Sequence, residues 1–168
     1  QESVTLVFNE PIDEASLAGL EWTVNGVIQT SFNPVLTGDE HNMLILYYGE
    51  MESGVTYQFD LSGLTDCWQN TIGLLQDKFG LAETAQAGDI IINEVLYNPF
   101  EGGSDFVEIY NNSMRVLSLK DWRIADGTGG FMNNADIITE LNYLLFPGEY
   151  LALGKNTSTL VQYYPATA

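Results

Sequence analysis

Two glutamates stand inside apolar segments that otherwise read as buried strands: Glu94 in "IIINEVL" and Glu108 in "FVEIYN". The loop around Pro99 to Gly103 separates these segments, which is typical of a β-hairpin. If Val95 pairs with Val107 in that hairpin, Glu94 faces Glu108. Side chains directly across such a pair lie about 4.5–5.5 Å apart, where like charges destabilise the sheet. Some other group must then compensate for the repulsion.

Three compensating groups are open at this point. The first is a calcium ion held by Glu94, Asp105 and Glu108, with added oxygen from Asn93 or a carbonyl, since calcium prefers oxygen ligands. The second is a hydrogen-bond donor from the backbone or from a nearby asparagine. A one-residue shift of register would place Glu108 opposite Asn93 or Val95 and remove the problem.

The third compensating group is a basic side chain. The chain has 5 basic and 23 acidic residues. Three of the basic ones, Arg115, Lys120 and Arg123, fall within nine positions of one another just after the hairpin. This clustering favours an ion pair from Arg123 or Lys120 over the calcium ion and the amide donor.

Other residues with chemical potential favour structural roles. His41 is the one histidine and lies in a polar loop, so we interpret it as a solvated residue. No nucleophile elbow or Gly-rich phosphate loop is present. Two further calcium candidates read better as plain turns, because neither has EF-hand spacing. They are the groups Asp126, Asn133, Asn134, Asp136 and Asp66, Asn70.

The tryptophans and the cysteine are also expected to be structural. Trp22, Trp68 and Trp122 could stack on sugars, but tryptophans in a small sandwich more often lie in the core, and Trp68 is the one expected to be exposed. Cys67 is the one cysteine, so this chain forms no internal disulfide and no thiolate zinc cluster. We expect Cys67 to be buried or half-buried.

The charge and the hydropathy pattern exclude several classes of protein. A net charge of −18 repels phosphate backbones and anionic lipid surfaces, so nucleic acid is not expected as a partner. No apolar run reaches the roughly 18 residues of a membrane-spanning helix. The sequence opens on a strand pattern without a visible signal peptide, and we expect it to be an excerpt of a longer protein.

In the first half, short alternating runs predict strands. "VTLVFN" alternates from Val4 to Asn9, and Asn25-Gly26 predicts a two-residue hairpin turn. Further strands are predicted over the four ranges 42–48, 55–64, 72–75 and 78–81. About seven strands are expected, and no window of 11 or more residues keeps a helical period, which indicates an antiparallel sandwich.

In the second half, the strand pattern restarts after a linker-like segment, "AETAQAGD" (82–89). Strands are predicted at "IIINEVL", "FVEIYN", "VLSLKDWRIAD", "TELNYLLF" and "EYLALG". A short helix is predicted in "KNTSTLVQYY", with Asn156 or Thr157 as its N-cap. Its apolar face is expected to hold Leu160, Val161 and Tyr164.

The first half resembles the bacterial Ig-like domains of the S-layer type over residues 1–85. The resemblance rests on "VTLVFNEPID" and on the later "YQFDLSGLTDCWQN". The late strand of that family ends in a Leu-x-Asp-x-x-Gly-Asn-like turn, matched here by Leu64, Asp66 and Asn70. Gln69 stands where the family usually has glycine.

The second half resembles the lamin tail domain of secreted and surface bacterial proteins over residues 88–168. "GDIIINEVLYNPFEGGSDFVEIYNNS", "LSLKDWRIAD" and "FPGEYLALG" carry the resemblance, in the family's order. The family domain runs on for several more strands, which either lie outside this sequence or are supplied by another copy. The resemblance implies an Ig-like β-sandwich that acts as a non-enzymatic scaffold or interaction module outside the cell.

Together these observations predict an all-β chain of two tandem Ig-like sandwiches, the second incomplete, without catalytic residues. We expect a structural or interaction module, extracellular or on the cell surface, with neighbouring domains or other surface proteins as partners and no cofactor. The alternative is a calcium-dependent carbohydrate-binding accessory of an extracellular hydrolase. Its ligands would be a glycan and a calcium ion near Glu94, Asp105 and Glu108.

Overall fold

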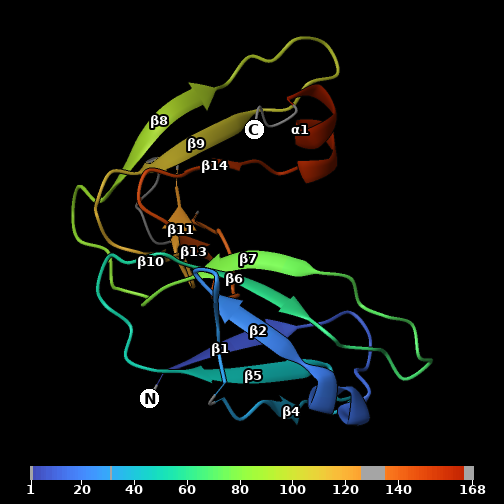
Figure 1. The fold of residues 1–168 in the computed structure, drawn as a ribbon. Helices are drawn as coiled ribbons and strands as arrows, with labels where there is room; N and C mark the ends of the chain where they lie inside the picture. The colour runs from blue at the N-terminus through green and yellow to red at the C-terminus, as the bar shows by residue number, and fades with distance from the viewer. Residues whose placement is uncertain (1, 31, 126–134, 165–168) are drawn as a thin grey trace. The chain divides into compact units, whose positions relative to one another are not determined.

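The computed structural model describes residues 2–30, 32–125 and 135–164 and divides the chain into two compact units, Gln1–Leu81 and Ala82–Ala168 (Figure 1). The predicted all-β fold class is confirmed, because the described residues form five small sheets of antiparallel strands. One α-helix occurs among these residues, α1 (Thr157–Tyr163), and it is too short to cross a membrane.

The first unit contains two sheets. One has the order β1-β5-β4 and the other β3-β2-β6-β7. A 3-10 helix, Glu14–Gly19, follows β1. The strands are β1 (Glu2–Val7), β2 (Glu21–Val24), β3 (Val27–Ile28), β4 (Val35–Thr37), β5 (Met43–Tyr48), β6 (Tyr57–Ser62) and β7 (Leu75–Phe79).

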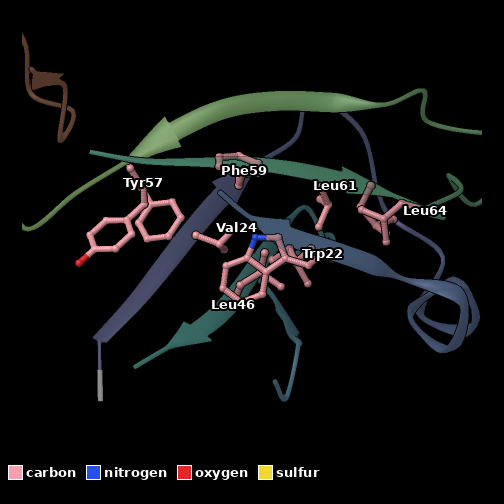
Figure 2. Close-up of a cluster of buried hydrophobic side chains, with 10 residues drawn as sticks. Trp22, Val24, Leu46, Tyr57, Phe59, Leu61 and Leu64 are labelled. Carbon is pink, nitrogen blue, oxygen red and sulfur yellow. The ribbon is translucent and has the colours of Figure 1, made fainter. Parts of the chain in front are cut away.

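The core of the first unit lies between these two sheets. Leu44 and Leu46 from β5 pack with residues of β2, β6 and β7 in one buried cluster. Figure 2 shows Trp22 beside Leu46, with Val24 and Phe59 close by. Trp22 is 1% exposed and makes an edge-to-face contact with Phe32, with ring centroids 5.4 Å apart. Strand alternation places these side chains on one face of each sheet, and burial of the large rings stabilises the sandwich.

Two local predictions for the first unit have different outcomes. The Asn25-Gly26 turn is confirmed: it joins β2 to β3, and both residues have positive φ angles, of 50° and 76°. The separate strands predicted at 72–75 and 78–81 are wrong, because one strand, β7, runs from the end of the first range into the start of the second. Ile72 instead donates its backbone N–H to Leu64, which keeps it in the preceding turn.

In the second unit, the residues that the structure describes form one three-stranded sheet and two short ribbons. The sheet has the order β14-β9-β8, and the ribbons pair β10 with β13 and β11 with β12. The strands are β8 (Ile90–Leu96), β9 (Phe106–Asn111), β10 (Leu117–Ser118), β11 (Arg123–Ile124), β12 (Asp136–Ile137), β13 (Leu144–Leu145) and β14 (Tyr150–Leu153). Its buried cluster consists of Ile109, Leu119 and Leu145.

Asn111, at the end of β9, ties three parts of this unit together. Its side chain is fully buried, and its Nδ2 donates to the carbonyls of Arg115 (2.8 Å) and Leu145 (2.9 Å). Its Oδ1 accepts from the backbone N–H and the hydroxyl of Ser113, at 3.0 and 2.7 Å. A buried amide that is satisfied in this way fixes the loop after β9 against β13.

Several sequence predictions for the second unit need correction. "VLSLKDWRIAD" is not one strand, because Asp121 adopts a φ of 61° and a turn separates β10 from β11. "TELNYLLF" contributes only the two residues of β13. Residues 82–89 are more than a linker, since Glu83 forms a parallel bridge with Leu117.

The predicted short helix is present. Asn156 is its N-cap, and its Oδ1 accepts from the N–H of Thr159 at 3.1 Å. Leu160 is buried, as predicted. Val161 is 73% exposed, so the prediction that it shares the buried face is wrong.

Candidate functional site

The two glutamates lie directly opposite each other, as the hairpin prediction requires. Glu94 pairs with Glu108, and Val95 with Val107, across β8 and β9. A β-bulge lies between Ile92 and Glu94, so Asn93 is the extra residue of the edge strand. The register that places the glutamates together is therefore confirmed.

The compensating group that the structure shows is an amide. The Nδ2 of Asn93 donates to the Oε1 of Glu108 at 2.6 Å. The bulge re-aims the side chain of Asn93 relative to an unbroken strand, which allows one edge residue to reach across to the partner strand. The donor neutralises no charge, so the two carboxylates still repel each other.

The preference for a basic partner is wrong. Arg115 forms an ion pair with Asp89, just before β8, and neither Lys120 nor Arg123 pairs with Glu94 or Glu108. The hydrogen bond that the Arg115 guanidinium donates to Asp89, followed by the one from the N–H of Gln86, lowers the pKa of Asp89, and the same bond to Asp89 raises the pKa of Arg115. The sequence pointed to the right cluster of cations but to the wrong carboxylate.

The calcium candidates are not brought together as a metal site. Within the described ranges no group of three His, Cys, Asp or Glu side chains could hold a metal ion, so Glu94, Asp105 and Glu108 do not form one. Asp105 is exposed in the hairpin loop. Of the second group, Asp126, Asn133 and Asn134 lie outside the described residues, and Asp136 lies 3.9 Å from Lys155.

The core-facing side of β8 packs against the buried cluster at Ile90 and is largely uncovered after it. Cross-strand pairing places Ile92 beside the buried Ile109, and Val95 beside Val107, which packs on the core. Yet Ile92 is 62% and Val95 52% exposed. Glu94 and Glu108 point to the opposite face, because successive side chains alternate across a strand.

In the first unit, Asp66 organises the turn after β6. It is 2% exposed, and its Oδ1 accepts from the N–H groups of Trp68 and Asn70, both at 2.8 Å. The side chain of Asn70 donates to the other oxygen at 2.6 Å and lowers the pKa of Asp66, although burial opposes the shift. This is the side-chain-to-backbone turn that the sequence predicted. Gln69 adopts a φ of 67°, a conformation that glycine adopts readily.

Three other sequence predictions concern exposed side chains. Trp68 is 69% exposed, as predicted, and His41 is exposed in its loop. Cys67 is exposed, so the expectation of a buried or half-buried thiol is wrong. The turn around Asp66 holds it at the surface.

A hollow of about 430 Å³ lies on the first unit, over the hairpin of β2 and β3 and over β6 and β7. Amide and carboxylate side chains line it, the groups that bind hydroxyls of a sugar. However, Asp60 already accepts from Thr23 (3.2 Å) and Gln76 (2.5 Å). Each oxygen of this carboxylate therefore already accepts one hydrogen bond from within the first unit.

Sequence reasoning missed Asn111 and the pair of Asp89 with Arg115. Both the hydrogen bonds of Asn111 and the ion pair depend on which loops lie next to each other in the fold, and sequence patterns do not show this. One signal was present: "NNS" at 111–113 follows a strand, and Asn and Ser side chains favour turns in which they bind the backbone.

A family model described as Lamin Tail Domain matches residues 83–166, half of the chain. The match lies within the second unit and begins at Glu83, the first residue of that unit with a bridge partner. No curated protein and no solved structure matches the chain.

Proposed function

We propose, from the premise that this chain belongs to the lamin tail domain family, that it is a structural and interaction module of a secreted or cell-surface bacterial protein. Lamin tail domains are Ig-like β-sandwiches without enzymatic activity. The proposal therefore starts from a non-catalytic module. The bacterial and extracellular setting is part of the proposal and rests on the phrases of residues 88–154 described above.

For the first unit we propose an S-layer-type Ig-like domain. The turn around Asp66 supports this assignment. Asp66 and Asn70 stand where the family phrase has Asp and Asn and are bonded to each other in the turn, and Gln69 has a positive φ where the phrase has Gly. Its buried aromatic cluster gives the rigid body that a spacer requires.

The observation that carries the proposal is that the polar side chains of the second unit form structural contacts within the unit. Asn111 and Asp89 bind loops to strands, and no third His, Cys, Asp or Glu side chain of the described part of the chain joins the facing Glu94 and Glu108 in a metal site. Such groups hold a shape and present a surface, and none is arranged as a nucleophile with a base. The role we propose is therefore the rigid display of strand edges and loops.

Thermal unfolding with calcium and with chelator tests this role against the calcium-dependent alternative. We expect the midpoint of the wild-type chain to be the same with calcium as with chelator, and we expect the midpoint of E108Q to be equally independent of calcium. A midpoint that calcium raises in the wild-type chain but not in E108Q would contradict the proposal and support the alternative. A glycan array with a specific signal would also favour the alternative.

The location has its own test. Antibodies against this chain are expected to label intact cells of its source organism or to detect the parent protein in the medium. Labelling that requires permeabilised cells, with none in the medium, would contradict the extracellular part of the proposal.

A further inference from the structure

The sheet β14-β9-β8 has an outer face, opposite to the one that packs on the buried cluster (Figure 1). Successive side chains alternate across a strand, so Glu108 and Tyr110 of β9 share this outer face, while Ile109 between them is buried. The strand pairing places Tyr150 of β14 beside Tyr110, and Glu94 of β8 beside Glu108. Two tyrosines and two glutamates therefore form adjacent rows on one surface, which we call the Tyr–Glu face.

The centre of the Tyr–Glu face does not depend on strands that lie outside the sequence. Further strands of a sandwich extend a sheet at its edges or pack on its inner face, because the inner faces of the two sheets form the core. Glu108 and Tyr110 lie on the central strand β9, and both of its neighbours, β8 and β14, are described. The strands on either side of these two residues are therefore already in place.

The two tyrosine rings of this face lie against each other and stay partly accessible. Their centroids are 4.6 Å apart, with an angle of 34° between the ring planes. Tyr150 is 56% exposed, and Tyr110 is half-buried. The face of an aromatic ring attracts a cation that lies within about 6 Å of the ring centroid. The next outward residue of β14 is Ala152, which lies opposite Glu108 and is too small to cover its carboxylate.

The two carboxylates face each other without a cation from the described part of the chain. Glu94 and Glu108 are a directly opposed pair, and Asn93 gives Glu108 only a neutral donor, at 2.6 Å. No basic side chain among the described residues forms an ion pair with either glutamate. Residues two apart along a strand lie about 6.5–7 Å apart, so a cation against the ring of Tyr110 also reaches the carboxylate of Glu108. Such a cation would relieve the repulsion between the glutamates.

We propose that the Tyr–Glu face binds an arginine side chain that another protein presents. The planar guanidinium lies on the tyrosine pair and donates hydrogen bonds to Glu108 and Glu94. A lysine supplies the charge without the flat surface, and a neutral sugar leaves the repulsion in place. A second copy of the chain would bring a further charge of −18, which disfavours self-association. This inference rests on the proposed function as an interaction module and adds the surface and the chemistry of its partner.

Three short peptides of glycine and serine, which differ only in a central arginine, lysine or citrulline, test the proposal by NMR titration of the chain. Citrulline has the shape of arginine without its charge. The titration uses chelator and about 0.15 M salt, which screens the general attraction of a cation to an acidic chain. We expect the arginine peptide to bind about tenfold tighter than the citrulline peptide and about threefold tighter than the lysine peptide. The shifted amides should belong to β9 and β14.

Protein variants separate the contributions of charge and ring. E108Q should weaken binding of the arginine peptide about tenfold and Tyr150→Ala about fivefold, whereas Tyr150→Phe keeps the ring face and should bind as the wild type does. One matched control is E101Q, which removes the same charge in the exposed hairpin loop. The other is Tyr97→Ala, which removes an exposed tyrosine just after β8. Both controls should bind as the wild type does.

Four results would overturn the proposal: no saturable shift with the arginine peptide, equal binding of the citrulline peptide, shifts away from β9 and β14, or an equal loss in E108Q and E101Q. A dimer in sedimentation, or a glycan-array signal, that Tyr150→Ala abolishes would also overturn it, because a second copy or a sugar would then occupy the face. Failure of the peptides alone leaves the calcium, glycan and location tests untouched, so it is distinguishable from failure of the proposed function.

Discussion

Glu94 and Glu108 face each other across β8 and β9, and among the residues that the structure describes the one side chain that donates to this pair is the amide of Asn93 in the adjoining bulge. This arrangement costs stability locally, because like charges directly opposite each other in a sheet are unfavourable. It gives the edge strand a negative charge that no basic side chain among the described residues pairs with.

Replacing Glu94 by Gln is expected to stabilise the second unit by about 0.2–1 kcal/mol, because the repulsion with Glu108 is removed. Urea unfolding at low ionic strength measures the change, and the gain should shrink in 1 M salt, where the Debye length is about 3 Å. E101Q, in the exposed hairpin loop, is the control and should change little. Equal gains for both variants would show that only net charge matters.

Asn111→Ala is expected to destabilise the second unit by about 2–3 kcal/mol. The change leaves the carbonyls of Arg115 and Leu145 without their donor in a buried place. Asn112→Ala, next along the chain and exposed, serves as the control. If both variants unfold at the wild-type urea concentration, Asn111 does not tie the loop to β13.

The ion pair of Asp89 and Arg115 predicts a specific pH dependence. The pKa of Asp89 is lowered in the folded chain, so its contribution to stability is present above the ordinary aspartate pKa of about 3.9 and is lost as the pH falls through the lower folded value. The gap in melting temperature between wild type and D89N should therefore be widest near neutral pH and close in acid. A gap that widens in acid would contradict the assignment; D39N, in an exposed loop, is the control.

In the first unit, Gly63→Ala is expected to cost about 2–5 kcal/mol. Gly63 has a φ of 89°, and a Cβ there would lie 2.1 Å from the carbonyl oxygen of Gly19. Gly73→Ala is the matched control, because a Cβ there meets nothing within 4 Å. Calorimetry of both variants checks this, and similar melting of the two would show that the turn after β6 adapts.

Much of this fold could be predicted from the sequence, because alternation and turn chemistry are local signals. β8 and β9 coincide with the runs that contain the two glutamates, and Asn25-Gly26 forms its hairpin. Pairing Val95 with Val107 also gave the register between the bulge and the hairpin loop. On the other side of the bulge the register is shifted by one residue, so that Ile92 pairs with Ile109, and the valine pair did not predict this shift.

The rest depends on contacts that local patterns do not encode. The partner of Arg115 is Asp89 and not a hairpin glutamate, because the loop after β9 returns to the start of β8. Cys67 is exposed because the turn around Asp66 presents it. The exposure of Ile92 and Val95 depends on which elements cover the sheet, whereas their apolar character alone predicted burial.

The register of β8 and β9 is the relationship on which the carboxylate pair and the shared face of Ile92 and Val95 both depend. Solution NMR measures it directly through cross-strand backbone contacts. We predict contacts that pair Val95 with Val107 and, on the other side of the bulge, Ile92 with Ile109. Contacts displaced by one residue would turn Ile92 and Val95 to the other face, separate Glu94 from Glu108, and contradict the account.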